Sequence, residues 1–104
     1  MNLNEIHFHD SILLRVIEET ESDQLCLEVD YPTDWENNIY QRRTILFTDV
    51  LNYQVYEGAF HGSPTILGVS EISEENNRKL IQIDTNAGYR LLAFKHVELK
   101  QRKT

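Results

Sequence analysis

The sequence lacks a second cysteine, a long apolar run and an excess of basic residues. Its single cysteine, Cys26, excludes an internal disulfide bond and fits a reducing compartment. No window of about 18 apolar residues is present, so the sequence predicts no membrane-spanning helix. The first residues, Met1 to Glu5, have neither the basic start nor the apolar stretch of a signal peptide. We therefore expect a cytoplasmic protein.

Basic residues are outnumbered, because 10 Lys and Arg against 17 Asp and Glu give a net charge of −7. This balance disfavours nucleic acid and membrane surfaces as partners. The charge is also uneven: residues 1–41 hold ten acids and one base, and residues 42–104 hold seven acids and nine bases. The acidic first part is either the solvated rim of a soluble protein or a face that attracts a basic protein partner.

The length and the composition of the chain fit a single folded domain over residues 1–104. A chain of 104 residues can bury a core without disulfides or a metal. Hydrophobic residues at 40% and charged residues at 26% argue against global disorder. We expect the basic tail, residues 100–104, to fray.

Period-two alternation is clearest in the first third of the chain. Apolar and polar residues alternate from Gln24 to Tyr31, which is typical of a strand with one buried face. Ile12 to Glu19 is apolar and rich in branched residues, and the link Thr20 to Asp23 is polar and short. These runs predict an antiparallel hairpin. A helix from Ser11 to Glu21 is the alternative, since part of the apolar spacing also fits one helical face.

Extended segments separated by turn residues continue to the end of the chain. Turn formers between Pro32 and Gln41 predict a loop of about ten residues. In the last segment, a bulge near Lys95 would let two apolar pairs face the core. The further predicted strands are Thr44–Phe47, Tyr53–Glu57, Ile66–Ile72, Lys79–Asp84 and Tyr89–Leu99.

This pattern predicts an all-β fold. We expect an antiparallel sandwich or a partly open barrel of about six to eight short strands, with at most one short helix. The residues predicted to fill the core are Leu25, Leu27, Val29, Ile45, Phe47, Ile81, Ile83, Leu92 and Phe94.

The run His7-Phe8-His9-Asp10-Ser11 gathers reactive residue types. It does not predict a catalytic triad, because neighbours in an extended chain point to opposite faces. His7 and His9 are two residues apart, so on a strand both rings would face one way and could share a metal. A third ligand would have to come from His61, His96 or Glu57. The alternative is structural: Phe8 fills the core while Asp10 and Ser11 bond to backbone groups.

Other candidate chemistry is weaker, and we expect neither a cofactor nor catalytic residues. Glu28 and Asp30 share a face with Cys26, and carboxylates beside a thiol disfavour the reactive thiolate. The acid pair itself is more typical of a wet strand face than of general acid–base catalysis. No phosphate loop, zinc knuckle or dinucleotide motif is present. The sequence therefore favours a protein that is not an enzyme.

Large aromatic residues lie in predicted loops, where they act either as lids over an open sheet end or as interface anchors. Trp35 and Tyr40 fall in the segment Pro32 to Gln41. Next to them, the stretch from Glu18 to Glu36 holds eight acids and no base. We predict that Glu28, Asp30 and Asp34 attract a basic partner and that Trp35 and Tyr40 anchor it.

The start Phe8-His9-Asp10-Ser11, the hairpin after it, and the later Ile45-Leu46-Phe47 followed by Val50 form a recognisable order. This order resembles small bacterial β-proteins with an F-H-D-S start, which are similar to immunity proteins of polymorphic toxin systems. The resemblance covers about the first half of the chain. It implies a small bacterial cytosolic protein that binds and neutralises a partner, with no catalytic residues to transfer.

Two functions stay open at the level of sequence. The first is a non-enzymatic protein-binding domain, in the form of an immunity-type inhibitor of a basic protein. The second is a small metal- or ligand-binding β-barrel that uses His7 and His9, with His61 and His96 as further ligands.

Overall fold

The fold is built almost entirely of strands. The computed structural model describes residues 1–34 and 36–101. Within that part of the chain, a single 3-10 turn near the N-terminus is the only helical element, and no helix is long and apolar enough to cross a membrane. The elements are η1 (Leu3–Glu5), β1 (Ile12–Glu19), β2 (Gln24–Asp34), β3 (Ile39–Thr48), β4 (Leu51–Glu57), β5 (Ile66–Glu75), β6 (Arg78–Thr85), β7 (Gly88–Phe94) and β8 (His96–Gln101).

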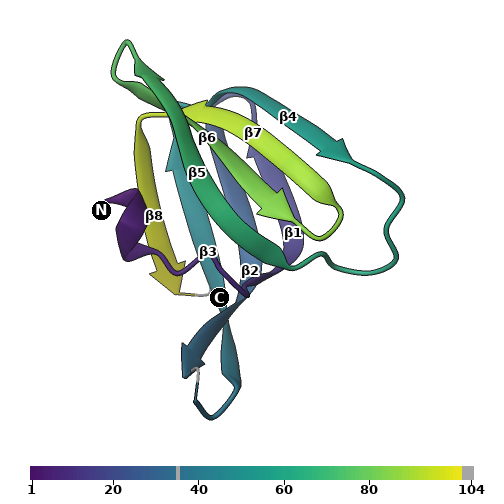
Figure 1. The fold of residues 1–104 in the computed structure, drawn as a ribbon. Coiled ribbons are helices and arrows are strands. Elements are labelled where there is room, and N and C mark those ends of the chain that lie inside the picture. Colours follow the sequence, from purple (N-terminus) through teal and green to yellow (C-terminus); the bar gives the residue numbers. More distant parts are fainter. Residues whose placement is uncertain (35, 102–104) are drawn as a thin grey trace.

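The strands form two antiparallel sheets that face each other (Figure 1). The first sheet has the order β1-β2-β3-β8, and the second has the order β4-β7-β6-β5. An isolated bridge between Ile12 and Thr65 joins the two sheets at one corner. In the described residues the sheets do not close into a barrel, so the fold is the sandwich that the sequence predicts. The hairpin of β1 and β2 is also confirmed, and the helical alternative for this segment is wrong.

The segment Pro32 to Gln41 is mostly strand, which corrects the predicted loop. β2 continues to Asp34 and β3 starts at Ile39. Pro32 is tolerated because the strand register shifts between Pro32 and Asp34, so a ladder bond is lost there in any case. The chain reverses its direction in a short turn between the two strands, where Asn38 has a φ of 56°.

The predicted last strand, Tyr89–Leu99, is two strands that belong to different sheets. The chain leaves the second sheet after Phe94 and enters the first sheet at His96. At the crossing, the Lys95 N–H donates to the Thr48 carbonyl at 3.1 Å. A bulge within one strand and a crossing from one sheet to the other both let two consecutive apolar pairs face the core. The sequence pattern therefore cannot distinguish a bulge from a crossing. The predicted frayed tail, residues 100–104, is also corrected in part, because Lys100 and Gln101 belong to β8. Residues 102–104 lie outside the described part of the chain.

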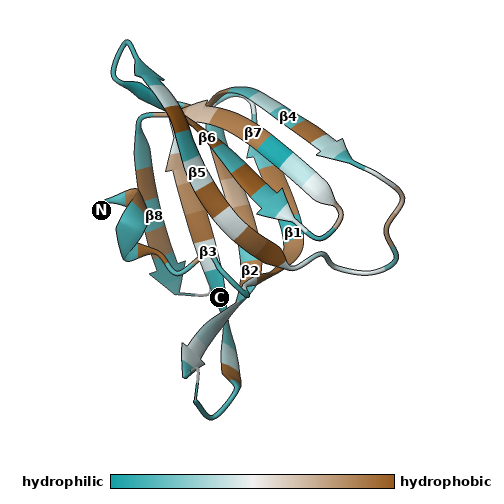
Figure 2. Ribbon diagram, viewed as in Figure 1, coloured by the Kyte–Doolittle hydropathy of each residue, from teal (hydrophilic) through white to brown (hydrophobic). Residues whose placement is uncertain are grey.

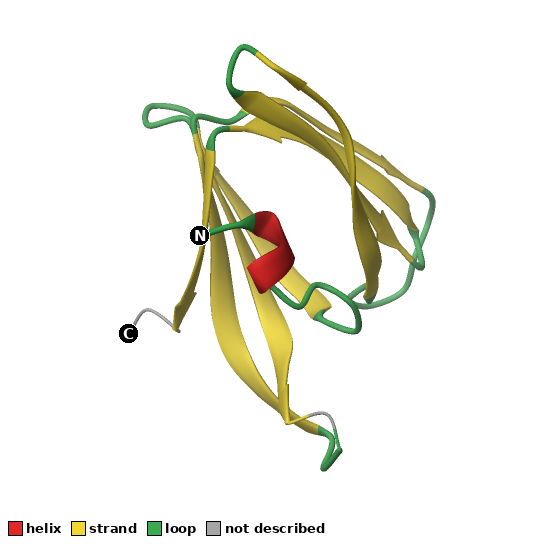
Figure 3. Cartoon of the chain, turned by 60° about the vertical axis from the view of Figure 1, so that its left-hand side comes forward, coloured by secondary structure: helices red, strands yellow, loops and turns green. Residues whose placement is uncertain are grey.

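The core lies between the sheets and contains all nine residues predicted for it. Phe47 of β3 and Phe94 of β7 meet edge to face with ring centroids 4.9 Å apart, which joins the two sheets. The N-terminal segment adds Ile6 and Phe8, and Figure 3 shows its 3-10 turn beside the open side of the sandwich. Figure 2 shows hydrophobic residues, in brown, recurring along the facing strands of both sheets.

The outward side chains form one outer face on each sheet, and the strand register defines both. We call the outer face of the first sheet the charged face; its cross-strand rows are Arg15–Glu28–Thr44–Lys100, Ile17–Cys26–Leu46–Glu98 and Asp30–Arg42. The outer face of the second sheet has three full rows, Tyr56–Tyr89–Asp84–Gly68, Gln54–Leu91–Gln82–Ser70 and Leu51–Ala93–Leu80–Ser73, and ends in the pair Arg78–Glu75 beside the turn between β5 and β6. We call the three full rows the neutral face.

We expect Phe94→Ala to lower the free energy of unfolding by roughly 3–5 kcal/mol, because it leaves a cavity beside Phe47 between the sheets. Urea unfolding followed by circular dichroism measures the change. Leu67→Ala is the control, since that side chain is half exposed and should cost well under half as much. Equal losses for the two variants would contradict the assigned core.

Candidate functional site

Strands β2 and β3 extend past their neighbours at one end of the first sheet. The pairing of β1 with β2 ends at Ile12 opposite Asp30, and the described part of β8 ends opposite Arg43. Beyond these points the described residues of β2 and β3 pair only with each other. Residues 31–34 and 36–41 therefore form a hairpin arm that projects from the sandwich, as Figures 1 and 3 show.

The tip of the hairpin arm is shaped by Asp34. Its carboxylate accepts hydrogen bonds from the Asn37 backbone N–H at 3.2 Å and from the Asn37 side-chain amide at 2.8 Å. These bonds hold the pKa of Asp34 below its ordinary value, because they favour the ionised form. Asp34 is thus a turn-forming residue, and its charge is maintained in a mildly acidic medium.

The hairpin arm also carries exposed apolar side chains. Ile39 and Tyr40 are 46% and 37% exposed, and Tyr40 lies opposite Pro32 in the ladder. Neighbouring exposed apolar residues on a projecting hairpin are typical of a contact surface. The sequence alone does not single out Ile39, because its turn residues predict a loop for the whole segment. The other predicted anchor, Trp35, lies outside the described residues.

Glu28 and Asp30 point outward from β2, as predicted, but each has a basic neighbour across the ladder. Arg15 Nη2 lies 3.0 Å from Glu28 Oε1, and Arg42 Nε lies 3.8 Å from Asp30 Oδ1. The stretch of eight acids is therefore not a continuous negative stripe on the surface. Sequence order hides this, because Arg15 and Arg42 come into place only through the pairing of β1, β2 and β3.

A shallow groove of about 450 Å³ runs over the charged face beside Glu28. Its middle is apolar, since Ile17, Cys26 and Leu46 are neighbours across three strands. Lys100 and Glu28 border it on the side nearer the hairpin arm. The predicted residues Glu28, Asp30, Asp34 and Tyr40 thus lie in order along β2 and β3, from this groove to the arm.

The two predicted histidines, His7 and His9, line a different groove of about 650 Å³ between the N-terminal segment and β5. Their ring centroids are 6.3 Å apart, and His9 Nδ1 lies 2.7 Å from the Leu67 carbonyl oxygen. Lys79 and Glu71, 3.8 Å apart, line the same groove.

The further ligands proposed for this pair lie elsewhere: His61 in the loop after β4, His96 at the start of β8 and Glu57 at the end of β4. None of the three lines the groove of His7 and His9. Across the described residues, no group of three or more His, Cys, Asp or Glu side chains is placed to hold a metal ion.

A buried polar cluster on the inner side of the second sheet was not predicted. Arg90 donates two hydrogen bonds of 2.7 Å to the Glu57 carboxylate and one of 2.9 Å to the Tyr53 hydroxyl. The Thr85 hydroxyl also donates to the Glu57 carboxylate, at 3.1 Å. The arginine holds the pKa of Glu57 below its ordinary value, and burial raises the pKa of Tyr53. Glu57 and Arg90 are 33 residues apart in the sequence, so no local sequence pattern predicts that they pair.

The cluster acts as a tie between β4 and β7. Its side chains are only 14% exposed for Arg90 and 11% for Glu57, and their polar atoms bond mainly to one another. Next to it, Gly88 has a φ of 149°, and a Cβ at this position would overlap the Tyr56 carbonyl oxygen. The close approach of β4 and β7 at this point therefore requires glycine.

Comparison with known proteins adds information about the fold alone. No family model and no curated protein matches the chain. One solved structure with a similar fold is the crystal structure of an uncharacterized protein from Neisseria gonorrhoeae. The TM-score is 0.52 and the sequence identity 14%, over 92% of this chain and 95% of that chain. The protein thus belongs by architecture to the all-β sandwiches.

We expect Glu57→Gln to lower the free energy of unfolding by about 2 kcal/mol at neutral pH, because Arg90 keeps its buried charge without an ionised partner. The pKa of Glu57 is lowered in the folded state, so its contribution is full above the ordinary value of 4.5 and is lost as pH falls through the folded pKa. Urea unfolding of wild type and variant at several pH values measures this.

The control for that measurement is Glu71→Gln, because the pair of Glu71 with Lys79 is exposed and should contribute less than about 1 kcal/mol. A difference between wild type and Glu57→Gln that stays constant down to strongly acidic pH would contradict the assigned role of the ionised carboxylate.

Proposed function

We propose that this protein is a small, non-enzymatic protein-binding domain that holds its partner with the hairpin arm and the adjoining charged face. The observation that carries the proposal is the extension of β2 and β3 beyond β1 and the described part of β8. Beyond Tyr31, which packs against the core, and the buried Pro32, the two-stranded arm adds nothing to the core between the sheets. Its length, exposed Ile39 and Tyr40 and fixed tip are features that a contact with another molecule would use.

The backbone of the hairpin arm supports this use. In the described residues, the outer edges of the arm have no third strand, so their N–H and C=O groups are open to hydrogen bonding by a partner. Strand edges of this kind bind extended segments through main-chain bonds, while side chains on alternate positions give specificity. Tyr40 is suited to anchor such a contact, since it joins a large apolar ring to a polar tip.

The partner we propose is basic. The chain carries a net charge of −7, and residues 1–41, which include β1, β2 and the tip of the arm, hold ten of its 17 acids. Because Glu28 and Asp30 already have arginine neighbours, the field of the whole acidic region matters more than any one of these carboxylates. Such a field steers a basic protein toward the surface and raises the association rate.

An immunity-type role is the specific form of this proposal. A small acidic domain that covers the working surface of a basic toxin needs no catalytic group. It needs a rigid fold, steering charge and a few anchors, and the sandwich with its projecting arm provides each of these. The order of residues from Phe8 to Val50 resembles proteins of this kind.

A second candidate function rests on the groove that holds His7 and His9. A groove of about 650 Å³ with two imidazoles, a carboxylate and an ammonium group is large enough for a small ligand. Its discriminating measurement is metal analysis of the purified protein together with thermal unfolding in added Zn²⁺. Stoichiometric metal, with a rise in melting temperature that His7→Gln/His9→Gln abolishes, would favour this function.

We expect Tyr40→Ala to speed dissociation of the natural partner at least tenfold, because it removes the anchor of the hairpin arm. The partner is first captured from the native cell with the tagged protein, then purified and measured by surface plasmon resonance. Tyr56→Ala is the matched control, since that tyrosine is also exposed but belongs to the second sheet. Binding to the wild type should weaken as salt rises.

Unchanged dissociation for both Tyr40→Ala and Ile39→Ala would place the contact elsewhere. A captured partner that is itself acidic would refute the proposal that the partner is basic. The role of the hairpin arm would still be decided by the dissociation rates of the two variants.

A further inference from the structure

The two outer faces of the sandwich differ sharply in charge. The charged face includes the pairs Arg15–Glu28 and Arg42–Asp30. The neutral face has three cross-strand rows with twelve positions, and Asp84 is the one charged residue among them; the charged pair Arg78–Glu75 lies at the margin of the same sheet, outside these rows. An ordinary protein surface of that size would carry about three or four charged side chains. The neutral face is therefore depleted of charge, in a chain with 26% charged residues.

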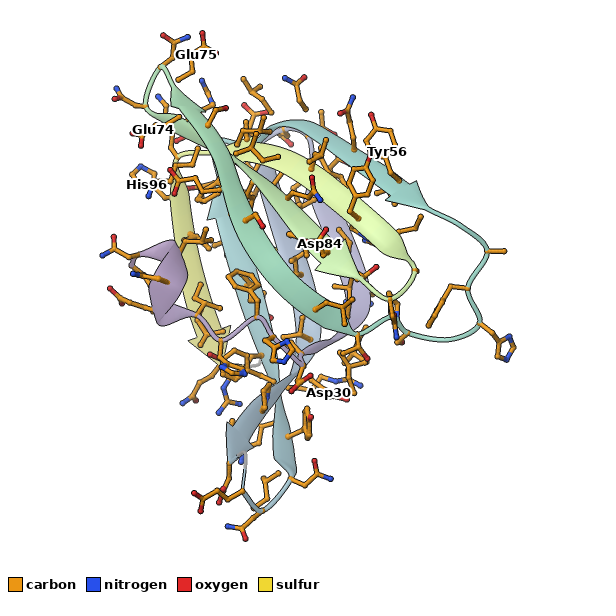
Figure 4. The ribbon with its side chains drawn as sticks, in the orientation of Figure 1. Asp30, Tyr56, Glu74, Glu75, Asp84 and His96 are labelled. Atoms are coloured by element: carbon orange, nitrogen blue, oxygen red, sulfur yellow. The ribbon has the colours of Figure 1, made fainter. Side chains whose placement is uncertain are left out.

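Apolar side chains take the place of the missing charges. Leu51, Tyr56 and Tyr89 are exposed, and Leu80 and Leu91 are half-buried between them. The rings of Tyr56 and Tyr89 stack at 5.0 Å with an interplanar angle of 22°, which gives a flat aromatic platform at the β4–β7 side. Figure 4 views the molecule toward this sheet and shows Tyr56 on β4 and Asp84 on β6.

We propose that the neutral face binds the neutral face of a second copy of this chain. Two copies with a charge of −7 each repel one another, and this face brings the fewest carboxylates into contact. Within the neutral face a basic partner would find only Asp84 to pair with, whereas an identical face offers leucine and tyrosine side chains that can pack against those of the first copy. Two flat sheet faces pack through interdigitated side chains, and a two-fold axis makes such a contact self-complementary.

The area of the neutral face sets the strength of this dimer. Four strands about 4.8 Å apart, each contributing about 20 Å of length, give a flat area of about 400 Å² per copy. The two copies together bury about 800 Å² by this measure, which is below the roughly 1,200–2,000 Å² of stable specific interfaces and in the range of weak, transient contacts. We therefore expect a reversible dimer with a dissociation constant of about 10 μM or weaker.

Sedimentation velocity of the full chain, at concentrations from about 5 μM to about 1 mM, tests the proposal across the range of a weak interface. The mass should rise from 12.3 kDa toward twice that value. Tyr56→Glu and, separately, Tyr89→Glu should raise the dissociation constant at least tenfold, because each places a carboxylate inside the apolar contact.

Val55→Glu is the matched control for these variants. It adds the same charge to the same strand at a similarly exposed position, but Val55 pairs with Arg90 and so points to the other side of β4 from Tyr56. Thermal unfolding of each variant shows that the fold is kept. The control should dimerise like the wild type, apart from the small effect of one added charge on each copy.

Salt provides a second readout that ordinary ion-pair contacts would not give. Raising NaCl from about 20 mM to about 500 mM should tighten the dimer, because salt screens the repulsion between two acidic copies. Three results would overturn the proposal: a monomer at every concentration and salt, a dimer that salt weakens, or a dimer that Tyr56→Glu and Tyr89→Glu leave unchanged.

The test of the dimer is independent of the test of the proposed function. Partner binding through Tyr40 is measured at concentrations where this chain is monomeric, and it involves the other sheet.

Discussion

The contact between Phe47 and Phe94 in the core sets the constraint on which the rest of the structure depends. Each strand that lines this core must turn every second side chain inward, so the residues between them are committed to an outer face. The strand register then decides which outward residues become neighbours. Arg15 lies beside Glu28 because Leu27 and Val29, the chain neighbours of Glu28, are held by the core. Tyr56 lies beside Tyr89 because the bonds between Glu57 and Arg90 hold β4 against β7. The surface chemistry of each face is thus a consequence of what lies on the inner side of its sheet.

The hairpin arm begins where this constraint ends. Val29 is the last residue of β2 in the hydrophobic core, Tyr31 packs against that core only in part, and Pro32 is the last buried residue of the strand. Past this point the two strands have no second sheet to cover, yet Asp34 and Asn37 still close the turn with side-chain bonds. A shorter hairpin that turned directly after Pro32 would lose no core residue. The added length is therefore best explained by a contact outside the molecule, which is the basis of the proposed binding role.

The sequence predicts well what depends on local periodicity. The nine proposed core residues follow from alternation, because a half-buried strand leaves a period of two in the chain, and the bounds of β1 follow from a run of branched apolar residues. Three features were not predicted, for physical reasons. The crossing at Lys95 changes sheets without changing the inward direction of the apolar residues, so it resembles a bulge. The Arg90–Glu57 tie and the arginine neighbours of Glu28 and Asp30 depend on pairing between distant segments, which one sequence does not specify.

The second sheet keeps several of its charges on the inner side, away from the neutral face. Glu57, Arg90 and Lys79 lie on the inner side, near the margins, where each has an oppositely charged partner. Keeping charges on the inner side requires hydrogen-bond partners for each, whereas the outer side could carry them freely in water. The neutral face instead exposes leucine and tyrosine to solvent, at a cost in solubility. Both departures have the same explanation if this face is covered in use, and the low charge of its rows is what an approaching acidic copy would meet with least repulsion.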